Sequence, residues 1–400
     1  MRYDVSWDFG ATSNDAARAE FMKLADAKEL CRKIVAQALY RTGLLRAVDR
    51  LFRSRELSPM EGSRLPRLRR SSRSKFGILC YHRVGTDGVP LFSRLQPKLF
   101  RAQMEHIKKR YRVVSLGQLC RELQDGTSAE PTLAITFDDG YRDLYTHAFS
   151  VLQEYQLPAT IYLIGQCMES GEVPWYDRIF LALKGVTGTS FEVEMDGFRQ
   201  FALSSPKARI EAAWEIVSYL RTKPDSWRQK WCASFEKEVL IRPEDTEGRM
   251  LKWDQVRTMF RAGVSFGAHT MSHPSVSRLD WQGLETELGE SKRLLEQGLG
   301  SPIEDFAYPF GKPEDRSLAA EEFLASYGYR SAVTTTEGFN IPGVSRFQLR
   351  RLSISDDWSL VDFAFNVSRM FLETPSEMRS IPIRSAEPVL SRMEQRELQG

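Results

Sequence analysis

The sequence has no long hydrophobic run and no apolar segment at its start. No stretch approaches the about 18 uninterrupted apolar residues that predict a transmembrane helix. The opening residues MRYDVSWD carry charges where a signal peptide needs an apolar core. We therefore expect a cytoplasmic protein.

Cysteine is scarce, odd in number and scattered, with no C-x-x-C pair. This pattern excludes a disulfide framework and a cysteine-based zinc site. We expect buried, reduced thiols at Cys31, Cys80, Cys120, Cys167 and Cys232.

An excess of charge of one sign is also missing: Lys and Arg total 56, Asp and Glu total 53, and the formal net charge is +3. This balance argues against a dedicated nucleic-acid-binding protein. Hydrophobic residues make up 42% and charged residues 27% of the chain, which excludes disordered, collagen-like and coiled-coil proteins. The basic run 64–75 is the exception. It is suited either to peripheral contact with an anionic membrane or a polysaccharide-synthesis complex, or to a solvated linker.

The order of apolar segments predicts the architecture. Residues 15–52 have helical periodicity, and with the basic run they form an expected N-terminal appendage over 1–75. From Phe76 onward, short apolar strands alternate with amphipathic helices, a pattern typical of a parallel sheet with helices outside it. We predict an α/β fold, a distorted, TIM-like (β/α) barrel of about seven strands, at Ile78–Val84, Leu133–Phe137, Ala159–Ile164, Val264–Ala268, Asp305–Tyr308, Ser331–Thr335 and Leu349–Ile354.

Helices are expected between these strands, around 98–110, 143–155, 253–262, 280–297, 315–327 and 359–371. Several of them end near a glycine suited to a helix C-terminus, among them Gly263, Gly298 and Gly328. The alternation of strands and helices is interrupted over 166–250, where a loop (Gly185–Gly197) and two helices (206–221 and 225–240) are expected. That interval is too long for a loop, so we predict an α-rich insertion between two barrel parts, 76–165 and 251–372, with a tail over 373–400.

Two adjacent carboxylates follow an apolar strand in the segment ITFDDGY. Neighbouring side chains on a strand point to opposite faces, so Asp138 and Asp139 serve one site only where the strand ends. Gly140 permits that departure. The C-terminal end of a barrel strand is where catalytic residues collect. A solvated turn with a helix-capping Asp is the alternative.

The segment GAHTMSHP places His269 and His273 four residues apart, on one face of a helical turn, a spacing that suits two imidazoles on one metal. Asp139 would complete a His₂Asp set with an open position. Two ordinary core or surface histidines are the alternative. His82 lies at the end of the first barrel strand, where a surface histidine is the alternative interpretation. A backbone N–H in the turn after the strand at Asp305 is suited to meet an oxyanion.

The other motifs that we considered do not indicate a function. Gly263–Gly267 matches the G-x-S-x-G nucleophile elbow, but Ser265 lies within a predicted strand and no histidine follows His273, so a serine hydrolase is not expected. There is no P-loop and no GxGxxG fingerprint, so no nucleotide cofactor is expected.

TFDDGY, HTMSH, the helix WDQVRTMFRAG and AYPFG together resemble the polysaccharide deacetylase family (carbohydrate esterase family 4, the NodB homology domain). The resemblance covers about 76–165 and 250–355. The opening LCYHRV is similar to the branch associated with bacterial exopolysaccharides.

The resemblance implies a hydrolase that removes N-acetyl groups from an amino-sugar polysaccharide or oligosaccharide. Asp139, His269 and His273 would hold a divalent metal, usually Zn²⁺ in this family. Asp138 would be the general base that deprotonates the attacking water, and the Phe310 N–H would stabilise the oxyanion.

The family's usual C-terminal histidine is absent from this chain, so the resemblance implies His82 as the general acid. The family's usual arginine is replaced here by Asp305 or Ala307, and Arg351 in LRRLSI resembles an arginine that would substitute for it. A carboxylate-based glycosidase and an inactive barrel that binds a glycan or a partner protein are the rival interpretations.

Overall fold

The computed structural model describes residues 75–86, 94–128, 130–239, 241, 246 and 248–372. The predicted N-terminal appendage, the basic run up to residue 74, and the tail from 373 lie outside these ranges. Within them, no helix combines the length and the apolar character needed to cross a membrane.

The centre of the fold is one parallel sheet with the strand order β11-β10-β9-β6-β5-β1-β12. The seven predicted strands are all present, and a short additional strand, β4 (Arg112–Val113), pairs with β5. They span β1 (Phe76–Tyr81), β5 (Thr132–Phe137), β6 (Thr160–Leu163), β9 (Ser265–Ala268), β10 (Asp305–Ala307), β11 (Ser331–Val333) and β12 (Leu352–Ser353). The prediction of a distorted (β/α) barrel of about seven strands is therefore confirmed.

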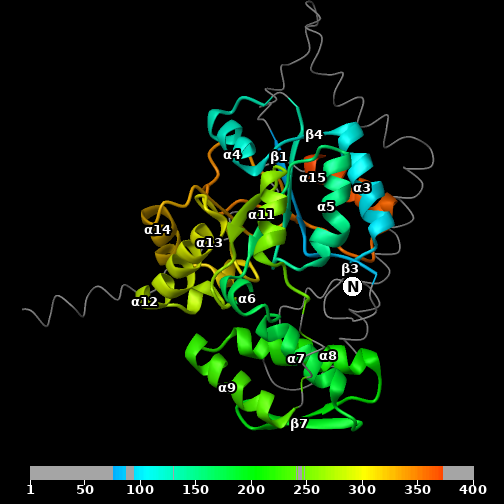
Figure 1. Cartoon of the computed structure of the whole chain (residues 1–400), viewed down its shortest axis with the longest axis vertical. Coiled ribbons are helices and arrows are strands. Elements are labelled where there is room, and N and C mark those ends of the chain that lie inside the picture. The colour runs from blue at the N-terminus through cyan, green and yellow to red at the C-terminus, as the bar shows by residue number, and fades with distance from the viewer. Residues whose placement is uncertain are drawn as a thin grey trace, which may run out of the picture.

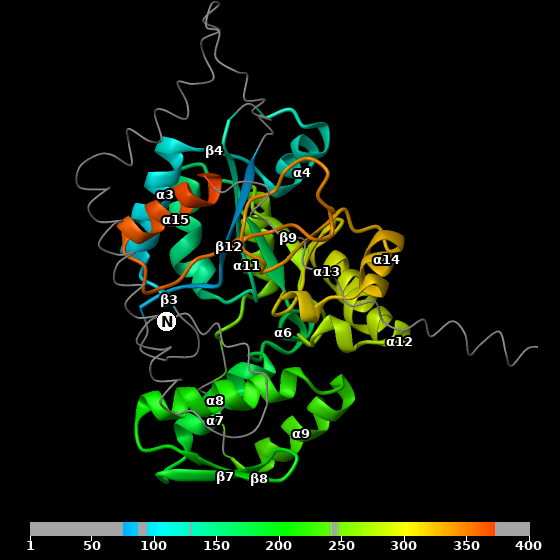
Figure 2. The ribbon, with the colours of Figure 1, turned by 180° about the vertical axis from the view of Figure 1, so that it is seen from behind.

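The last strand segment links the two ends of this sheet. Leu352 in β12 pairs with Leu79 in β1, and Leu349, just before β12, forms a parallel bridge with Val333 in β11. The sheet is thereby curled so that one face points inward and the other faces the helices (Figure 2).

Helices surround the outer face of the sheet (Figure 1). Two predicted helices contain a π-helical segment, η1 (Leu144–Ala148) before α5 (Phe149–Glu154) and η3 (Glu285–Glu290) between α12 and α13. The others on the barrel are α3 (Pro97–Arg110), α4 (Leu116–Asp125), α11 (Trp253–Arg261), α12 (Trp281–Leu284), α13 (Ser291–Leu299), α14 (Leu318–Ser326) and α15 (Leu360–Leu372).

One glycine does not have the expected role. Gly298 lies inside α13, and Gly300, with φ 72°, is the left-handed residue that ends the helix. A Cβ on Gly298 would lie 2.1 Å from the Trp253 ring, so this glycine allows the indole to pack against α13.

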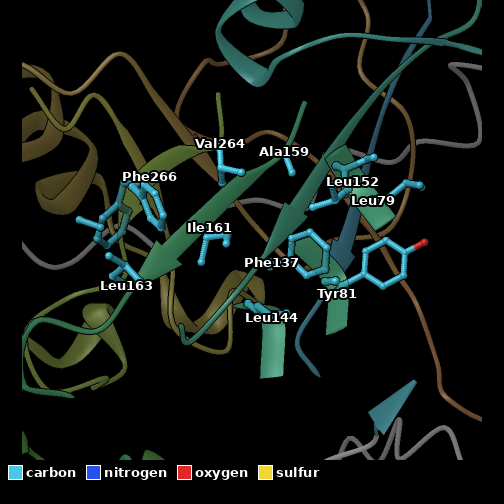
Figure 3. Close-up of a cluster of buried hydrophobic side chains, with 14 of the residues drawn as sticks. Leu79, Tyr81, Phe137, Leu144, Leu152, Ala159, Ile161, Leu163, Val264 and Phe266 are labelled. Carbon is cyan, nitrogen blue, oxygen red and sulfur yellow. The ribbon is translucent and has the colours of Figure 1, made fainter. Parts of the chain in front are cut away.

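Side chains alternate between the two faces of the sheet along each strand, so the barrel has one hydrophobic cluster on its outer face and one on its inner face. Leu79 and Tyr81 on β1 pack outward with Phe137 and Ile161 against the helices (Figure 3). A second cluster, which includes Ile78, Ala134, Tyr162, Val333 and Leu349, fills the inner face of the sheet. Because alternate residues share a face, Thr136 and Asp138 continue the inner row that begins at Ala134.

Residues 166–250, which we call the insertion subdomain, pack around a hydrophobic cluster of their own. Its elements are α6 (Gly165–Ser170), α7 (Trp175–Gly185), the hairpin β7 (Ser190–Glu194) and β8 (Phe198–Ala202), α8 (Pro206–Arg221) and α9 (Asp225–Glu238). Figure 1 shows α7, α8, α9 and β7 gathered below the barrel. Helices α8 and α9 were predicted. Within the loop expected over Gly185–Gly197, Ser190–Glu194 instead form the first strand of a hairpin, in which Val193 and Phe201 are buried.

Candidate active site and metal centre

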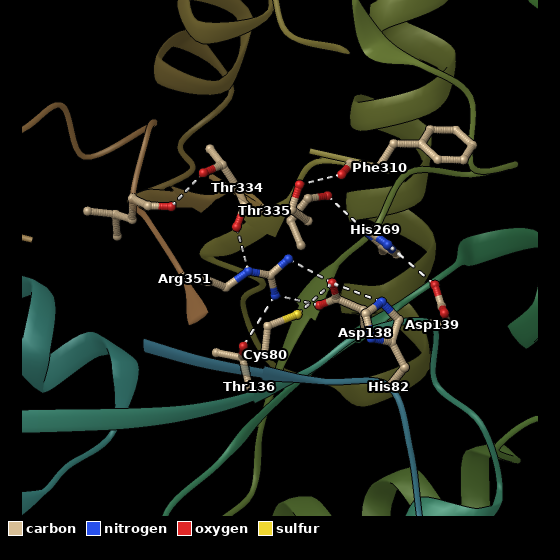
Figure 4. Close-up of polar contacts among 12 residues, drawn as sticks. Cys80, His82, Thr136, Asp138, Asp139, His269, Phe310, Thr334, Thr335 and Arg351 are labelled. Atoms are coloured by element: carbon tan, nitrogen blue, oxygen red, sulfur yellow. Dashed lines mark hydrogen bonds and ion pairs between the residues drawn. The ribbon is translucent and has the colours of Figure 1, made fainter. Parts of the chain in front are cut away.

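The two adjacent aspartates lie where β5 ends. Asp138 donates its N–H to the Tyr81 carbonyl at 3.0 Å and so stays in register with β1. Asp139 has φ 72° and Gly140 has φ 78°, so the chain turns away from the sheet immediately. A left-handed backbone at a non-glycine residue costs of order 1–3 kcal/mol and is found mainly at functional sites. The turn separates the two carboxylates, which then meet different partners (Figure 4).

Asp139 faces the two histidines. Its Oδ1 lies 3.4 Å from His269 Nε2 and 3.7 Å from His273 Nε2, and all three residues are buried. These three side chains form one of two groups with metal-ligating atoms within 4.8 Å of one another in the described residues. Ligands at 2.0–2.1 Å from a tetrahedral Zn²⁺ lie about 3.4 Å apart, so this donor set fits a metal ion of that size.

The two imidazole rings differ in their hydrogen bonding and in their pKa. His269 Nδ1 lies 2.7 Å from the Ala307 carbonyl, which fixes the ring and leaves Nε2 facing Asp139. Burial alone would lower the pKa of His269, but the hydrogen bond to Asp139 and the nearby carboxylates raise it overall. Burial and the neighbouring His269 lower the pKa of His273 to about 3, so its ring is neutral and able to ligate.

The backbone between the histidines is not the helical turn that their spacing predicted. Residues 269–273 form a tight loop in which Thr270 has φ 64° and His273 has φ 61°. The loop still brings the two rings to a centroid distance of 4.8 Å. The prediction of a helical turn was wrong, because Thr270 Oγ1 accepts the His273 N–H at 2.9 Å and closes the loop locally.

Asp138 has a cationic partner in place of the histidines. Arg351 Nη1 and Nη2 donate to its two carboxylate oxygens, each at 2.7 Å, and both side chains are buried. Thr334 O and Thr136 Oγ1 accept further hydrogen bonds from the guanidinium at 2.8 and 3.2 Å. Burial would raise the pKa of Asp138, but Arg351 holds it well below its usual range. Asp138 is therefore an ionised carboxylate inside the barrel mouth.

His82 lies on the open side of this carboxylate. Its Nε2 is 3.9 Å from Asp138 Oδ2, and its side chain is 36% exposed, so it is in contact with solvent. Cys80, His82 and Asp138 form the second group of three potential metal ligands. Because Arg351 already occupies both oxygens of Asp138 with positive charge, this group is the poorer site for a cation.

The turn after β10 carries Phe310 at φ 58°. Its carbonyl accepts the Thr335 hydroxyl at 2.6 Å, and its ring contacts the His273 ring at 5.0 Å. Within the described part of the chain, the Phe310 N–H makes no hydrogen bond. An N–H left without a partner beside a metal-ligating histidine is suited to bind an oxyanion.

The other sequence signals lie elsewhere. Ser265 is the first residue of β9 and pairs with Thr160, at the opposite end of the strand from His269. Asp305 begins β10 and accepts the Ser331 hydroxyl, while Ala307 supplies the carbonyl that holds His269.

Two contributors to the site were not predicted. Cys80 Sγ lies 3.5 Å from Asp138 Oδ2, and Thr136 contacts Arg351. Both lie on the inner rows of β1 and β5, so the period-two alternation that places Asp138 would have found them. Four cysteines lie in the described residues, and all four are free thiols.

Comparisons with known proteins identify the family of this chain. The family described as "Polysaccharide deacetylase" matches residues 125–332, more than half of the chain. A Bacillus subtilis (strain 168) protein named putative polysaccharide deacetylase YxkH is 23% identical over 299 residues, which cover 74% of this chain and 77% of that protein.

Two further relatives are more distant or shorter in their match. The poly-beta-1,6-N-acetyl-D-glucosamine N-deacetylase of Escherichia coli (strain K12) is 30% identical over 99 residues, 24% of this chain and 15% of that protein. The Streptococcus pyogenes deacetylase PplD, solved in complex with acetate, has the same fold, with a TM-score of 0.51 at 20% identity over 74% of this chain and 99% of that chain. With more than half of its length matched by the family, this chain belongs to the polysaccharide deacetylases, hydrolases of carbohydrate esterase family 4.

Proposed function

We propose that this chain is a metal-dependent N-deacetylase that hydrolyses the acetamide groups of an amino-sugar polymer of the exopolysaccharide type. The observation that carries the proposal is that the two adjacent carboxylates have different partners. Asp139 faces two buried histidines at 3.4 and 3.7 Å, whereas Asp138 is held by Arg351.

Asp139, His269 and His273 would hold the metal, for which Zn²⁺ is the natural candidate for a His₂Asp set. A divalent ion bound there supplies a Lewis acid that polarises a carbonyl and lowers the pKa of water. The neutral His273 and the oriented Nε2 of His269 leave two imidazole lone pairs available for it.

The remaining groups would carry the protons and the developing charge. Asp138, ionised, would accept the proton of the attacking water. The Phe310 N–H would donate to the carbonyl oxygen as it becomes negative. His82, next to Asp138 and in contact with solvent, would donate a proton to the departing amine.

The first test is zinc binding to the apo-protein, because it requires no knowledge of the glycan. We expect one Zn²⁺ per wild-type chain and none in His269→Ala. The second test is acetate release from an acetylated glucosamine polymer, which Asp138→Asn should abolish. Folded wild type that binds no zinc would contradict the proposal and favour a non-catalytic glycan-binding barrel.

A further inference from the structure

The metal-ligand loop is held in an unfavourable backbone conformation. Thr270 and His273 both have positive φ, at a cost of order 1–3 kcal/mol each. Such a loop keeps its shape only if neighbouring groups hold it. On the barrel side, the buried Glu287 accepts the N–H groups of Met271 and Ser272 at 3.0 and 2.8 Å.

His273 lacks the support that His269 has. His269 is oriented through its ring by the Ala307 carbonyl. In His273, the buried Nδ1 has no hydrogen-bond partner among the described residues. A metal-ligating histidine ordinarily donates this second nitrogen to a carbonyl or carboxylate. The orientation of His273 therefore depends on its backbone and on the rings packed against it.

Besides the Phe310 ring, two of these supports come from the first turn of α7. Trp175 Nε1 donates to the His273 carbonyl at 3.1 Å in a buried hydrogen bond. The next residue, Tyr176, places its ring edge-on to His273 at a centroid distance of 4.7 Å. Figure 1 shows α7 on the side of the insertion subdomain that adjoins the barrel.

A second helix of the insertion subdomain strengthens this contact. Arg228, in α9, is buried and lies over the Trp175 ring at 4.8 Å. The same guanidinium donates to Ser272 Oγ, beside the ligand, at 3.0 Å. Two helices outside the barrel thus act on consecutive residues of the metal-ligand loop.

We infer that Trp175 is a positioning residue through which the insertion subdomain sets the metal affinity of the site. This inference rests on the proposed metal site. The indole N–H fixes the His273 carbonyl, which holds the left-handed backbone and directs Nε2 toward Asp139. Outer-shell partners of metal ligands typically contribute about 10- to 100-fold in metal affinity.

The experiment is zinc affinity of the apo-protein, measured by competition with a chromophoric chelator, for wild type and Trp175→Phe. Phenylalanine keeps an aromatic ring in α7 but removes the N–H donor. We expect the Kd for Zn²⁺ to rise about 10-fold or more. The visible spectrum of the Co²⁺-loaded protein should also change, because a displaced ligand alters the coordination geometry.

The matched control is Trp231→Phe. Trp231, in α9 of the same subdomain, also donates its Nε1–H to a backbone carbonyl, that of Glu194, at 2.7 Å. Its loss should leave the zinc affinity and the Co²⁺ spectrum as in wild type. An effect common to both variants would mean that subdomain stability, and not Trp175, sets the affinity, and would overturn the inference.

A Trp175→Phe protein with wild-type zinc affinity would also overturn the inference while leaving the metal site intact. Wild type that binds no zinc would contradict the proposed function instead. If Trp175→Phe does not fold, Arg228→Met provides the second variant, since it removes the cation from the indole and the bond to Ser272. Unchanged zinc affinity in folded Arg228→Met would then count against the inference, and a rise in Kd would support it.

Discussion

Arg351 and Asp138 form a buried, bidentate ion pair with two hydrogen bonds of 2.7 Å, although 213 residues separate them in the chain. Asp138 follows β5 and Arg351 precedes β12, and β1 lies between these two strands. The pair therefore spans β1 and connects the early and late parts of the barrel. It also keeps the Asp138 carboxylate ionised in a position where burial alone would favour the neutral acid.

Replacing Arg351 with Met should destabilise the protein by about 3–5 kcal/mol, because the Asp138 charge would stay buried without its partner. The double variant Asp138→Asn, Arg351→Met should lose less stability, since it leaves no unpaired buried charge. The measurement is urea unfolding of the apo-protein. Equal losses in the single and double variants would show that the ion pair is not the source of the effect.

Replacing His82 with Ala should reduce turnover by ~10²–10⁴-fold if His82 is the general acid. Zinc affinity should not change, because His82 is outside the proposed ligand set. The measurement pairs acetate release with zinc titration. His147→Ala, the same change in η1, is the control and should behave like wild type. Wild-type turnover in His82→Ala would remove the residue from the mechanism.

Asp177 should make stability fall as pH rises from about 4 to about 7. Burial raises the pKa of this carboxyl from 3.8 to about 7, against the opposing effects of the Tyr141 hydrogen bond and Arg83. Between these values the folded state keeps a proton that the unfolded state has lost, so stability present below pH 4 is lost as pH approaches 7. The change is at most about 1.4 kcal/mol per pH unit.

The test of Asp177 is the difference in unfolding free energy between Asp177→Asn and wild type, measured on apo-protein across this pH range. Asparagine can still accept the Tyr141 hydroxyl, which bonds Asp177 Oδ2 at 2.9 Å. The unfolding free energy of Asp177→Asn relative to that of wild type should increase as pH increases. A difference that is constant with pH would contradict the assignment of a raised pKa.

Gly267 should not tolerate a side chain. A Cβ there would lie 2.5 Å from the Tyr162 ring and 2.7 Å from the Asp305 carbonyl, inside the curled sheet. Gly267→Ala should therefore lower the melting temperature, with a cost of about 1–3 kcal/mol. Gly117→Ala is the control, because the nearest atom is 3.6 Å away, on the flexible Arg121. In helix α4 that change should be neutral or stabilising.

The barrel could be predicted because its strands are parallel and buried on both faces, so each appears in the sequence as a short apolar run. Helix α7 could not be predicted in this way. Eight of its 11 residues are buried, including Trp175, Tyr176, Ile179, Phe180 and Leu183, so the buried residues are not confined to one stripe of the helix. The hairpin that follows it was missed because it is short and most of its side chains are exposed.

The candidate site was predicted unevenly for similar reasons. The end of an apolar strand predicted Asp138 and Asp139, and the spacing of two histidines predicted His269 and His273. Both signals are local in the sequence. The bond between Arg351 and Asp138 depends on strands that meet only in the folded sheet, and only family resemblance pointed to it. The contact of Trp175 with His273 had no sequence signal, because it joins segments 98 residues apart.

The position of Leu349–Ser353 also bears on how the protein is made. Among the strands of the described residues, the ribosome delivers this segment last, yet it pairs with both β11 and β1. Until it emerges, a nascent chain has two unpaired strand edges that can capture other polypeptides. Asp138 has no Arg351 at that stage either. Closure of the sheet between β11 and β1 and the charge partner of Asp138 therefore arrive together, late in translation, and a message cut short before this segment yields neither.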